Sequence, residues 1–146
     1  MTIRKVGVIG AGQMGNGIAH VVALAGFDVL LNDIARDRIE AGLATINGNL
    51  ARQARSGRIT EEQRADTLKR IKPAETFGAL EDCDLVIESA VENEEIKRKI
   101  FTEVAALLKP EAMLATNTSS ISVTRLAAAT GRPEKFMGVH FMNPVP

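Results

Sequence analysis

Short apolar runs alternate with segments of helical apolar spacing along the whole chain. Apolar runs of roughly four to eight residues bounded by turn residues are typical of buried strands, whereas apolar residues recurring every three to four positions indicate helices. The expected strands are 3–9, 27–33, 72–76, 84–91, 112–118 and 136–141. The expected helices are 13–25, 36–56, 60–70, 94–108 and 123–129.

Turn and capping residues agree with these boundaries. Gly26 closes the first helix, and Thr60 with Gln63 forms the capping-box pattern that opens the third. Within the first helix, one face should point to the core, and it consists of Met14, Ile18, Val21, Val22 and Ala25.

Strands that alternate with helices and are apolar throughout belong to a parallel sheet covered on both faces. We therefore expect an α/β protein of the Rossmann type, with a doubly wound, mostly parallel sheet. At 146 residues, without repeats or an internal linker, the sequence is expected to form one domain, residues 1–146.

Composition narrows the functional classes. Lys plus Arg equals Asp plus Glu at 18 each, so no net charge favours nucleic acid or a membrane surface. No apolar stretch is long enough to span a bilayer, and no signal segment precedes the first strand. Cys83, the single cysteine, should be a small buried side chain, and no metal site is expected. These features predict a cytoplasmic protein.

The first strand runs into a G-x-G-x-x-G sequence that opens a helix. In this context the pattern predicts a dinucleotide site, because glycines allow the tight turn and the approach of a diphosphate to the helix amides. The expected cofactor-binding residues here are Gly10, Ala11, Gly12, Gln13, Met14 and Gly15.

An acidic residue, Asp33, ends the next strand near the expected spacing of about 20 residues. Its carboxylate would bind the ribose hydroxyls and repel a 2′-phosphate, which favours NAD over NADP, although Arg36 nearby would weaken that preference. A tight turn with an incidental acidic residue and an FAD-binding domain are the alternatives at this point.

Three further segments stand behind the glycine loop: V-E-N at 91–93, T-N-T-S-S at 116–120 and H-F-M-N-P-V-P at 140–146. In this order and spacing the whole chain resembles the 3-hydroxyacyl-CoA dehydrogenase family, in particular its bacterial 3-hydroxybutyryl-CoA dehydrogenases. Flavin enzymes lack the last two segments, so the FAD alternative is set aside.

The resemblance implies NAD-dependent oxidation of L-3-hydroxyacyl-CoA, with short-chain substrates, to 3-oxoacyl-CoA, a reaction of fatty acid and butanoate metabolism. It makes His140 the catalytic base and Ser119 the residue that hydrogen-bonds the substrate oxygen. Further cofactor contacts implied for this region are Glu92, Lys97, Asn117, Ser119 and Asn143. Ser119 as a helix cap, and Glu92 with Lys97 as a solvated helix start, are the structural alternatives.

The residues support this assignment independently. Removing a hydroxyl proton needs a base that titrates near neutrality, and His140 ends a strand on the side where parallel sheets bind ligands. His20, the other histidine, lies inside the first helix, where a packing or surface role is expected.

The basic second helix is a candidate site for coenzyme A, since guanidinium groups match phosphate geometry. The resemblance implies contacts from this region to the acyl-CoA substrate, although charged helix faces are often merely solvated. The candidate substrate-binding residues are Asn49, Arg52, Arg55, Ser56 and Arg58, together with Ser119.

Family members also have a catalytic glutamate that would lie beyond Pro146 here, followed by a helical domain that closes over the substrate and forms the dimer. The 146 residues alone are therefore expected to bind NAD but to be weakly active or inactive, within a parent protein that forms a homodimer or higher oligomer. The alternatives are a related 3-hydroxyacid dehydrogenase similar to L-gulonate 3-dehydrogenase, and a non-catalytic NAD-binding module.

Overall fold

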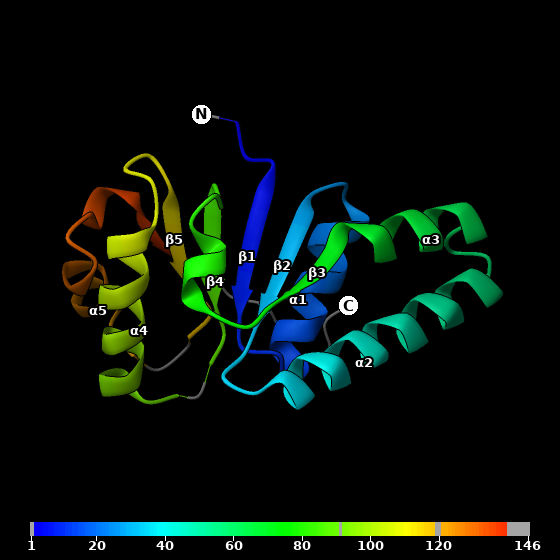
Figure 1. Ribbon diagram of the computed structural model, residues 1–146, viewed down its shortest axis with the longest axis horizontal. Coiled ribbons are helices and arrows are strands. Elements are labelled where there is room, and N and C mark those ends of the chain that lie inside the picture. The colour runs from blue at the N-terminus through cyan, green and yellow to red at the C-terminus, as the bar shows by residue number, and fades with distance from the viewer. Residues whose placement is uncertain (1, 91, 119–120, 140–146) are drawn as a thin grey trace.

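The computed structural model describes residues 2–90, 92–118 and 121–139, and in these ranges six parallel strands form one sheet in the order β3-β2-β1-β4-β5-β6 (Figure 1). The strands are β1 (Lys5–Ile9), β2 (Asp28–Asn32), β3 (Ile71–Ala74), β4 (Leu85–Glu88), β5 (Met113–Thr116) and β6 (Phe136–Gly138). The helices are α1 (Gln13–Leu24), α2 (Arg36–Arg55), α3 (Glu61–Arg70), α4 (Glu94–Leu107) and α5 (Val123–Ala129), with short 3₁₀ turns η1 (Phe77–Leu80) and η2 (Pro133–Lys135). The expected doubly wound parallel fold is confirmed.

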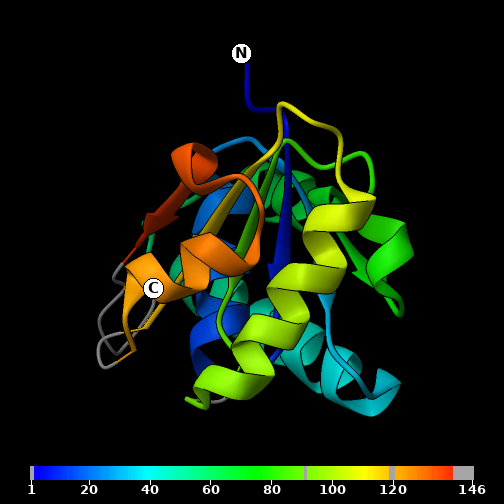
Figure 2. The same cartoon turned by 90° about the vertical axis from the view of Figure 1, so that its left-hand side faces the viewer.

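Helices cover both faces of the sheet. On one face Val8 packs in a core with Ile18 of α1 and Leu50 of α2. On the other face the core includes Phe101 of α4 and Leu126 of α5. Figure 2 shows α4 and α5 nearest the viewer, with the strands and α1 behind them. Burial on both faces explains why the sequences of the central strands β1, β4 and β5 are largely apolar.

The strand order reverses beside β1, whose neighbours are β2 on one side and β4 on the other. Ile9, the last residue of β1, is in register with Asn32 of β2 and with Glu88 of β4. The loops that follow these three strands therefore begin side by side. In open parallel sheets such a reversal point, at the carboxyl ends of the strands, is where ligands bind.

The predicted core face of α1 was partly wrong. Ile18 is fully buried as expected, but Ala25 is exposed and Met14 is only half-buried. Asn16 and His20 are buried instead. The reason is that α1 lies against the sheet on one side and against α2 and α3 on others, so its buried surface is wider than one apolar stripe.

Two further side chains, those of Cys83 and Arg132, belong to the packing of the fold and lie outside the candidate site. Cys83 is fully buried, as expected, and burial raises the pKa of its thiol to about 11. Arg132 donates from its guanidinium to carbonyl oxygens at the end of α4, including those of Ala105 and Lys109 at 2.8 and 2.7 Å. It thereby satisfies carbonyl groups that a helix end leaves without intrahelical partners.

Candidate functional site: the glycine loop and the groove beside it

The glycine loop follows β1 and opens α1, as predicted. Gly10 has a φ of +98°, a backbone conformation that residues other than glycine rarely adopt. Its amide donates to the Asn32 carbonyl at 2.8 Å. A Cβ on Gly15 would lie 1.6 Å from the Gly10 carbonyl oxygen, so only glycine lets α1 approach the loop this closely. A Cβ on Gly12 would meet no atom within 4 Å. The loop is therefore closed on its inner side and open above Gly12.

The open side of the loop is suited to an anion. Gly12 is the N-cap of α1, no side chain caps this end, and the first turn has no acidic residue. The helix dipole and the amides of the first turn therefore favour a negatively charged group. These features fit the diphosphate of a dinucleotide.

We expect alanine at positions 12 and 15 to have different effects. Gly15→Ala should lower the free energy of unfolding by about 2 kcal/mol, because helix and loop must separate, and should weaken NADH binding as well. Gly12→Ala should weaken NADH binding while leaving stability unchanged, since its methyl group enters open space on the ligand side. Urea unfolding and NADH fluorescence titration of both variants check this. Equal losses of stability in the two would contradict it.

Asp33 is joined directly to the glycine loop. One carboxylate oxygen accepts the Ala11 amide at 2.8 Å and the other accepts the Ile34 amide at 2.7 Å. The carboxylate is buried, and it lies where β2 ends next to the loop. The Asp33 carboxylate therefore lies beside the glycine loop, where a ribose contact was predicted. Each of its oxygens keeps a lone pair that can accept a further hydrogen bond.

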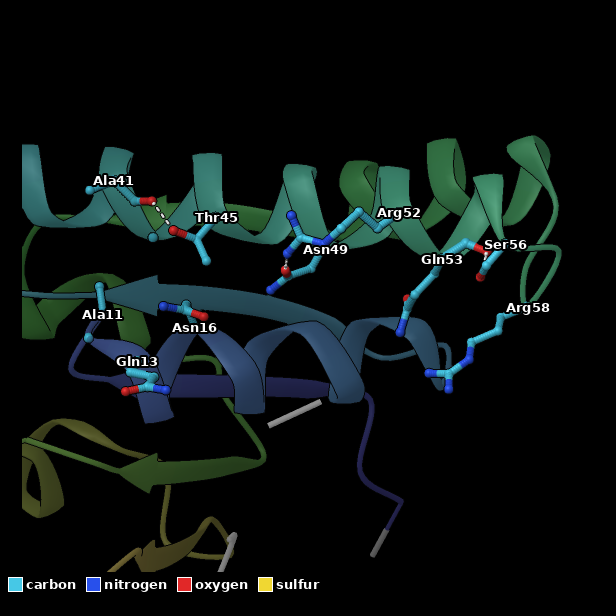
Figure 3. Close-up of a pocket in the computed structure, with 12 residues that line it drawn as sticks. Ala11, Gln13, Asn16, Ala41, Thr45, Asn49, Arg52, Gln53, Ser56 and Arg58 are labelled. Atoms are coloured by element: carbon cyan, nitrogen blue, oxygen red, sulfur yellow. Dashed lines mark hydrogen bonds between the residues drawn. The ribbon is translucent and has the colours of Figure 1, made fainter. Parts of the chain in front are cut away.

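A groove of about 800 Å³ begins at this loop and follows α2 (Figure 3). At one end it is lined by Ala11, Gly12, Gln13 and Asn16. Along α2 and the turn after it, the lining residues are Ala41, Gly42, Thr45, Asn49, Arg52, Gln53, Ser56 and Arg58. The Arg52 guanidinium donates to the Asn49 side-chain oxygen.

Four of the five candidates on and after α2 thus line one groove with the glycine loop. Arg55 is the exception, because it is exposed and is not among the described residues that line the groove. Helical geometry is consistent with the difference, since Thr45, Asn49 and Ser56 lie near the centre of the helix face that lines the groove, and Arg55 lies beyond its margin. A substrate contact from Arg55 stays a prediction.

A buried ion pair lies where β4 ends. Lys97 and Glu88 are both fully buried, and the Lys97 ammonium lies 2.5 Å from Glu88 Oε2. The carboxylate also accepts the Ala90 amide at 2.7 Å and the Thr116 hydroxyl at 2.8 Å. Sequence reasoning missed Glu88, although an acidic residue within the apolar run of β4 is an unusual feature.

Lys97 and Glu92 are the predicted cofactor contacts of this region. The Lys97 ammonium forms an ion pair with Glu88 and lies 3.6 Å from Glu92 Oε1. Glu92 is exposed, and it accepts the Thr118 hydroxyl at 2.6 Å. A cofactor contact from either residue stays a prediction, but Lys97 has a structural role that the sequence did not indicate.

The remaining candidates follow the carboxyl ends of β5 and β6. The Asn117 amide donates to the Glu88 carbonyl at 2.8 Å, and the Val139 amide donates to the Thr116 carbonyl at 2.9 Å. Residues 117 and 139 are therefore adjacent to the same edge of the sheet. Ser119, His140 and Asn143 lie outside the described residues.

His20 has the packing role that its position suggested. It is fully buried, and its Nε2 lies 3.0 Å from Gln53 Oε1 across the α1–α2 contact. Burial lowers the pKa of His20, an effect that the hydrogen bond with Gln53 opposes. Among the described residues no His, Cys, Asp and Glu cluster could hold a metal ion, and no helix is long and apolar enough to cross a membrane.

Three features define a Rossmann-type dinucleotide-binding domain: the strand order, the glycine loop that opens α1 without a side-chain cap, and the acidic residue after β2. Residues 5–146 match the model of the 3-hydroxyacyl-CoA dehydrogenase NAD binding domain, and the chain belongs to this family.

Relatives and solved structures agree with the family. The chain is 69% identical over 144 residues to a 3-hydroxybutyryl-CoA dehydrogenase of Bradyrhizobium diazoefficiens, covering 99% of this chain and 49% of that protein. The crystal structure of the (S)-3-hydroxybutyryl-CoA dehydrogenase of Ralstonia eutropha has a TM-score of 0.96 at 43% identity, covering 99% of this chain and 51% of that one. The 3-hydroxybutyryl-CoA dehydrogenase of Escherichia coli has a TM-score of 0.97 at 42% identity, covering all of this chain and 31% of that one. The chain thus spans about half, or less, of the length of these proteins.

Proposed function

We propose that this chain is the NAD-binding part of an NAD-dependent L-3-hydroxyacyl-CoA dehydrogenase that acts on short-chain substrates such as 3-hydroxybutyryl-CoA. The observation that supports this most directly is the groove, which joins the glycine loop at one end to Asn49, Arg52, Ser56 and Arg58 at the other. A dinucleotide diphosphate at the loop and a coenzyme A phosphate at the arginines would lie along one continuous surface.

The cofactor residues follow from the loop geometry and the family resemblance. The amides of residues 12–15 would hold the diphosphate, and Asp33, which already accepts the Ala11 amide, would accept hydrogen bonds from the adenosine ribose. Asn117 and Asn143 would orient the nicotinamide, and Glu92 would contact the central part of the cofactor. Met14, half-buried at the start of α1, is a further predicted cofactor contact.

The reaction needs one proton transfer and one hydride transfer. When bound, NAD accepts the hydride from C3 of the substrate. His140 would take the hydroxyl proton in this direction and return it when the ketone is reduced. Ser119 would donate a hydrogen bond to the substrate oxygen and so fix its position relative to the imidazole.

The experiment that tests the proposal is reduction of acetoacetyl-CoA, followed through the absorbance of NADH, with the 146 residues alone and with a longer protein that includes them. We expect the 146 residues to bind NADH, but with turnover on the order of 10⁴-fold below that of the longer protein, as for a histidine without its orienting carboxylate. A longer protein that binds NADH but does not reduce acetoacetyl-CoA would contradict the assigned substrate. Activity on a 3-hydroxyacid without coenzyme A would favour the gulonate-type alternative.

The arginines provide a separate prediction. In the longer protein, Arg52→Ala should raise KM for acetoacetyl-CoA about tenfold, because one charge-assisted contact to phosphate is lost, with KM for NADH unchanged. Arg55→Ala is the matched control, since it removes the same charge from the same helix outside the groove. Equal effects of the two substitutions would indicate a general charge effect and would argue against a coenzyme A contact at Arg52.

A further inference from the structure

The corner of the sheet where β2 and β3 end holds an acidic residue on each strand. Asn32 and Ala74 are in register, and the Asn32 side-chain amide donates to the Ala74 carbonyl at 2.8 Å. Asp33 and Glu75 are the next residues of the two strands. Glu75 therefore lies one strand away from the carboxylate that is assigned to the ribose.

Arg36, the first residue of α2, lies between these elements and is held by two carboxylates. Its Nε lies 3.1 Å from Glu40 Oε1, one helical turn further along α2. Its Nη1 lies 2.5 Å from Glu75 Oε1, in the segment after β3. The guanidinium is thus bound from two sides by residues that belong to different elements.

The charges at this corner matter for the choice of dinucleotide. NADP differs from NAD by a phosphate on the adenosine 2′-oxygen, and Rossmann domains that accept it do so with a nearby arginine. Here the nearby arginine is bound by two carboxylates, those of Glu40 and Glu75, and the Asp33 carboxylate lies at the end of the neighbouring strand. A dianionic phosphate placed beside Arg36 would therefore meet the carboxylates that already bind its guanidinium.

We propose that Glu40 and Glu75 determine cofactor specificity: by binding Arg36 they withhold it from a 2′-phosphate and so select NAD over NADP. The proposal rests on the assignment of the adenosine ribose to Asp33. It also explains how an arginine only three residues after that aspartate is compatible with an NAD-binding domain.

The test is calorimetric titration of NADPH and NADH into the chain and its variants. In Glu40→Gln/Glu75→Gln we expect NADPH affinity to rise about tenfold, through one guanidinium–phosphate contact and the loss of repulsion. NADH affinity should stay within about twofold of the original, because NADH has no group that the freed guanidinium prefers. Adding Arg36→Ala to the double variant should remove the part of the gain that the guanidinium contributes, whereas Arg36→Ala alone should not raise NADPH affinity.

The charge-matched control is Glu81→Gln/Glu103→Gln, which alters two exposed carboxylates elsewhere on the surface. An equal gain in this control, or no gain in Glu40→Gln/Glu75→Gln, would overturn the inference while NADH still binds. Failure of the unaltered chain to bind NADH at all would overturn the cofactor assignment as well, which distinguishes the two results. The circular dichroism spectrum of each variant verifies that it is folded.

Discussion

Replacing His140 with asparagine, in a longer protein that includes this chain, is expected to lower kcat for acetoacetyl-CoA reduction on the order of 10³-fold. The reason is that no other group assigned to the substrate side can exchange a proton with its oxygen near neutral pH, whereas asparagine keeps a hydrogen-bonding group without that capacity. The measurement is steady-state turnover over a range of pH, together with the Kd of NADH.

The two measurements separate chemistry from binding. The Kd of NADH should not change, because the substitution leaves in place the glycine loop and Asp33, which are assigned to the diphosphate and the adenosine ribose. The pH dependence that a titrating imidazole imposes on the rate should disappear with the side chain. Wild-type turnover in the asparagine variant would refute the role of His140 as base, and a loss of NADH binding would point to a structural role instead.

Lys97→Met is expected to lower the free energy of unfolding by about 3–5 kcal/mol, the range found when one partner of a buried ion pair is removed. Methionine fills much of the space of the lysine chain, so the main loss is electrostatic. The Glu88 carboxylate would keep the Ala90 amide and the Thr116 hydroxyl, but it would remain buried without its counter-charge. Urea unfolding followed by circular dichroism measures the change.

Two variants serve as controls for this prediction. Lys99→Met removes the same charge from the same helix, but Lys99 is exposed and lies 3.8 Å from the exposed Glu95, so its effect should stay below about 0.5 kcal/mol. Lys97→Met combined with Glu88→Gln should recover part of the loss, because no buried charge is left. If Lys97→Met and Lys99→Met were equally stable, Lys97 would not have the structural role assigned to it.

The Glu88–Lys97 pair also bears on the cofactor site. It connects the end of β4 to the start of α4 and, through Thr116, to the end of β5. Ser89 adds a hydrogen bond from its hydroxyl to the Ile9 carbonyl, at 3.1 Å, just before the glycine loop. Polar contacts between strand ends thus position the loops at the edge where the dinucleotide is expected to bind.

Local pattern was sufficient for the elements themselves. The apolar runs predicted every strand of the sheet, with boundaries that the structure shortens by one to three residues in most cases, as at β4 (Leu85–Glu88) against 84–91. The capping box at Thr60 and Gln63 is present, with both of its hydrogen bonds. These features depend on residues a few positions apart, which a sequence displays directly.

The apolar pattern of a helix was a weaker guide to what it buries. Asn16 and His20 are buried because α1 packs against the sheet and against two helices, and this environment depends on segments distant in sequence. Which residues of α2 line the groove likewise depends on the packing of α2 beside the glycine loop, which the sequence pattern does not display.

The sequence by itself determined the alternation of strands and helices, the glycine loop and the acidic residue after β2, because each is set by spacing within a short stretch of chain. Only the tertiary structure decided which side chains pair. Glu88 forms an ion pair with Lys97, and Glu75 forms one with Arg36. Asp33 accepts the Ala11 amide. Such pairings join side chains from different strands and helices. Their energy depends on burial and distance, and both are defined only when the parallel strands bring their carboxyl ends to one edge.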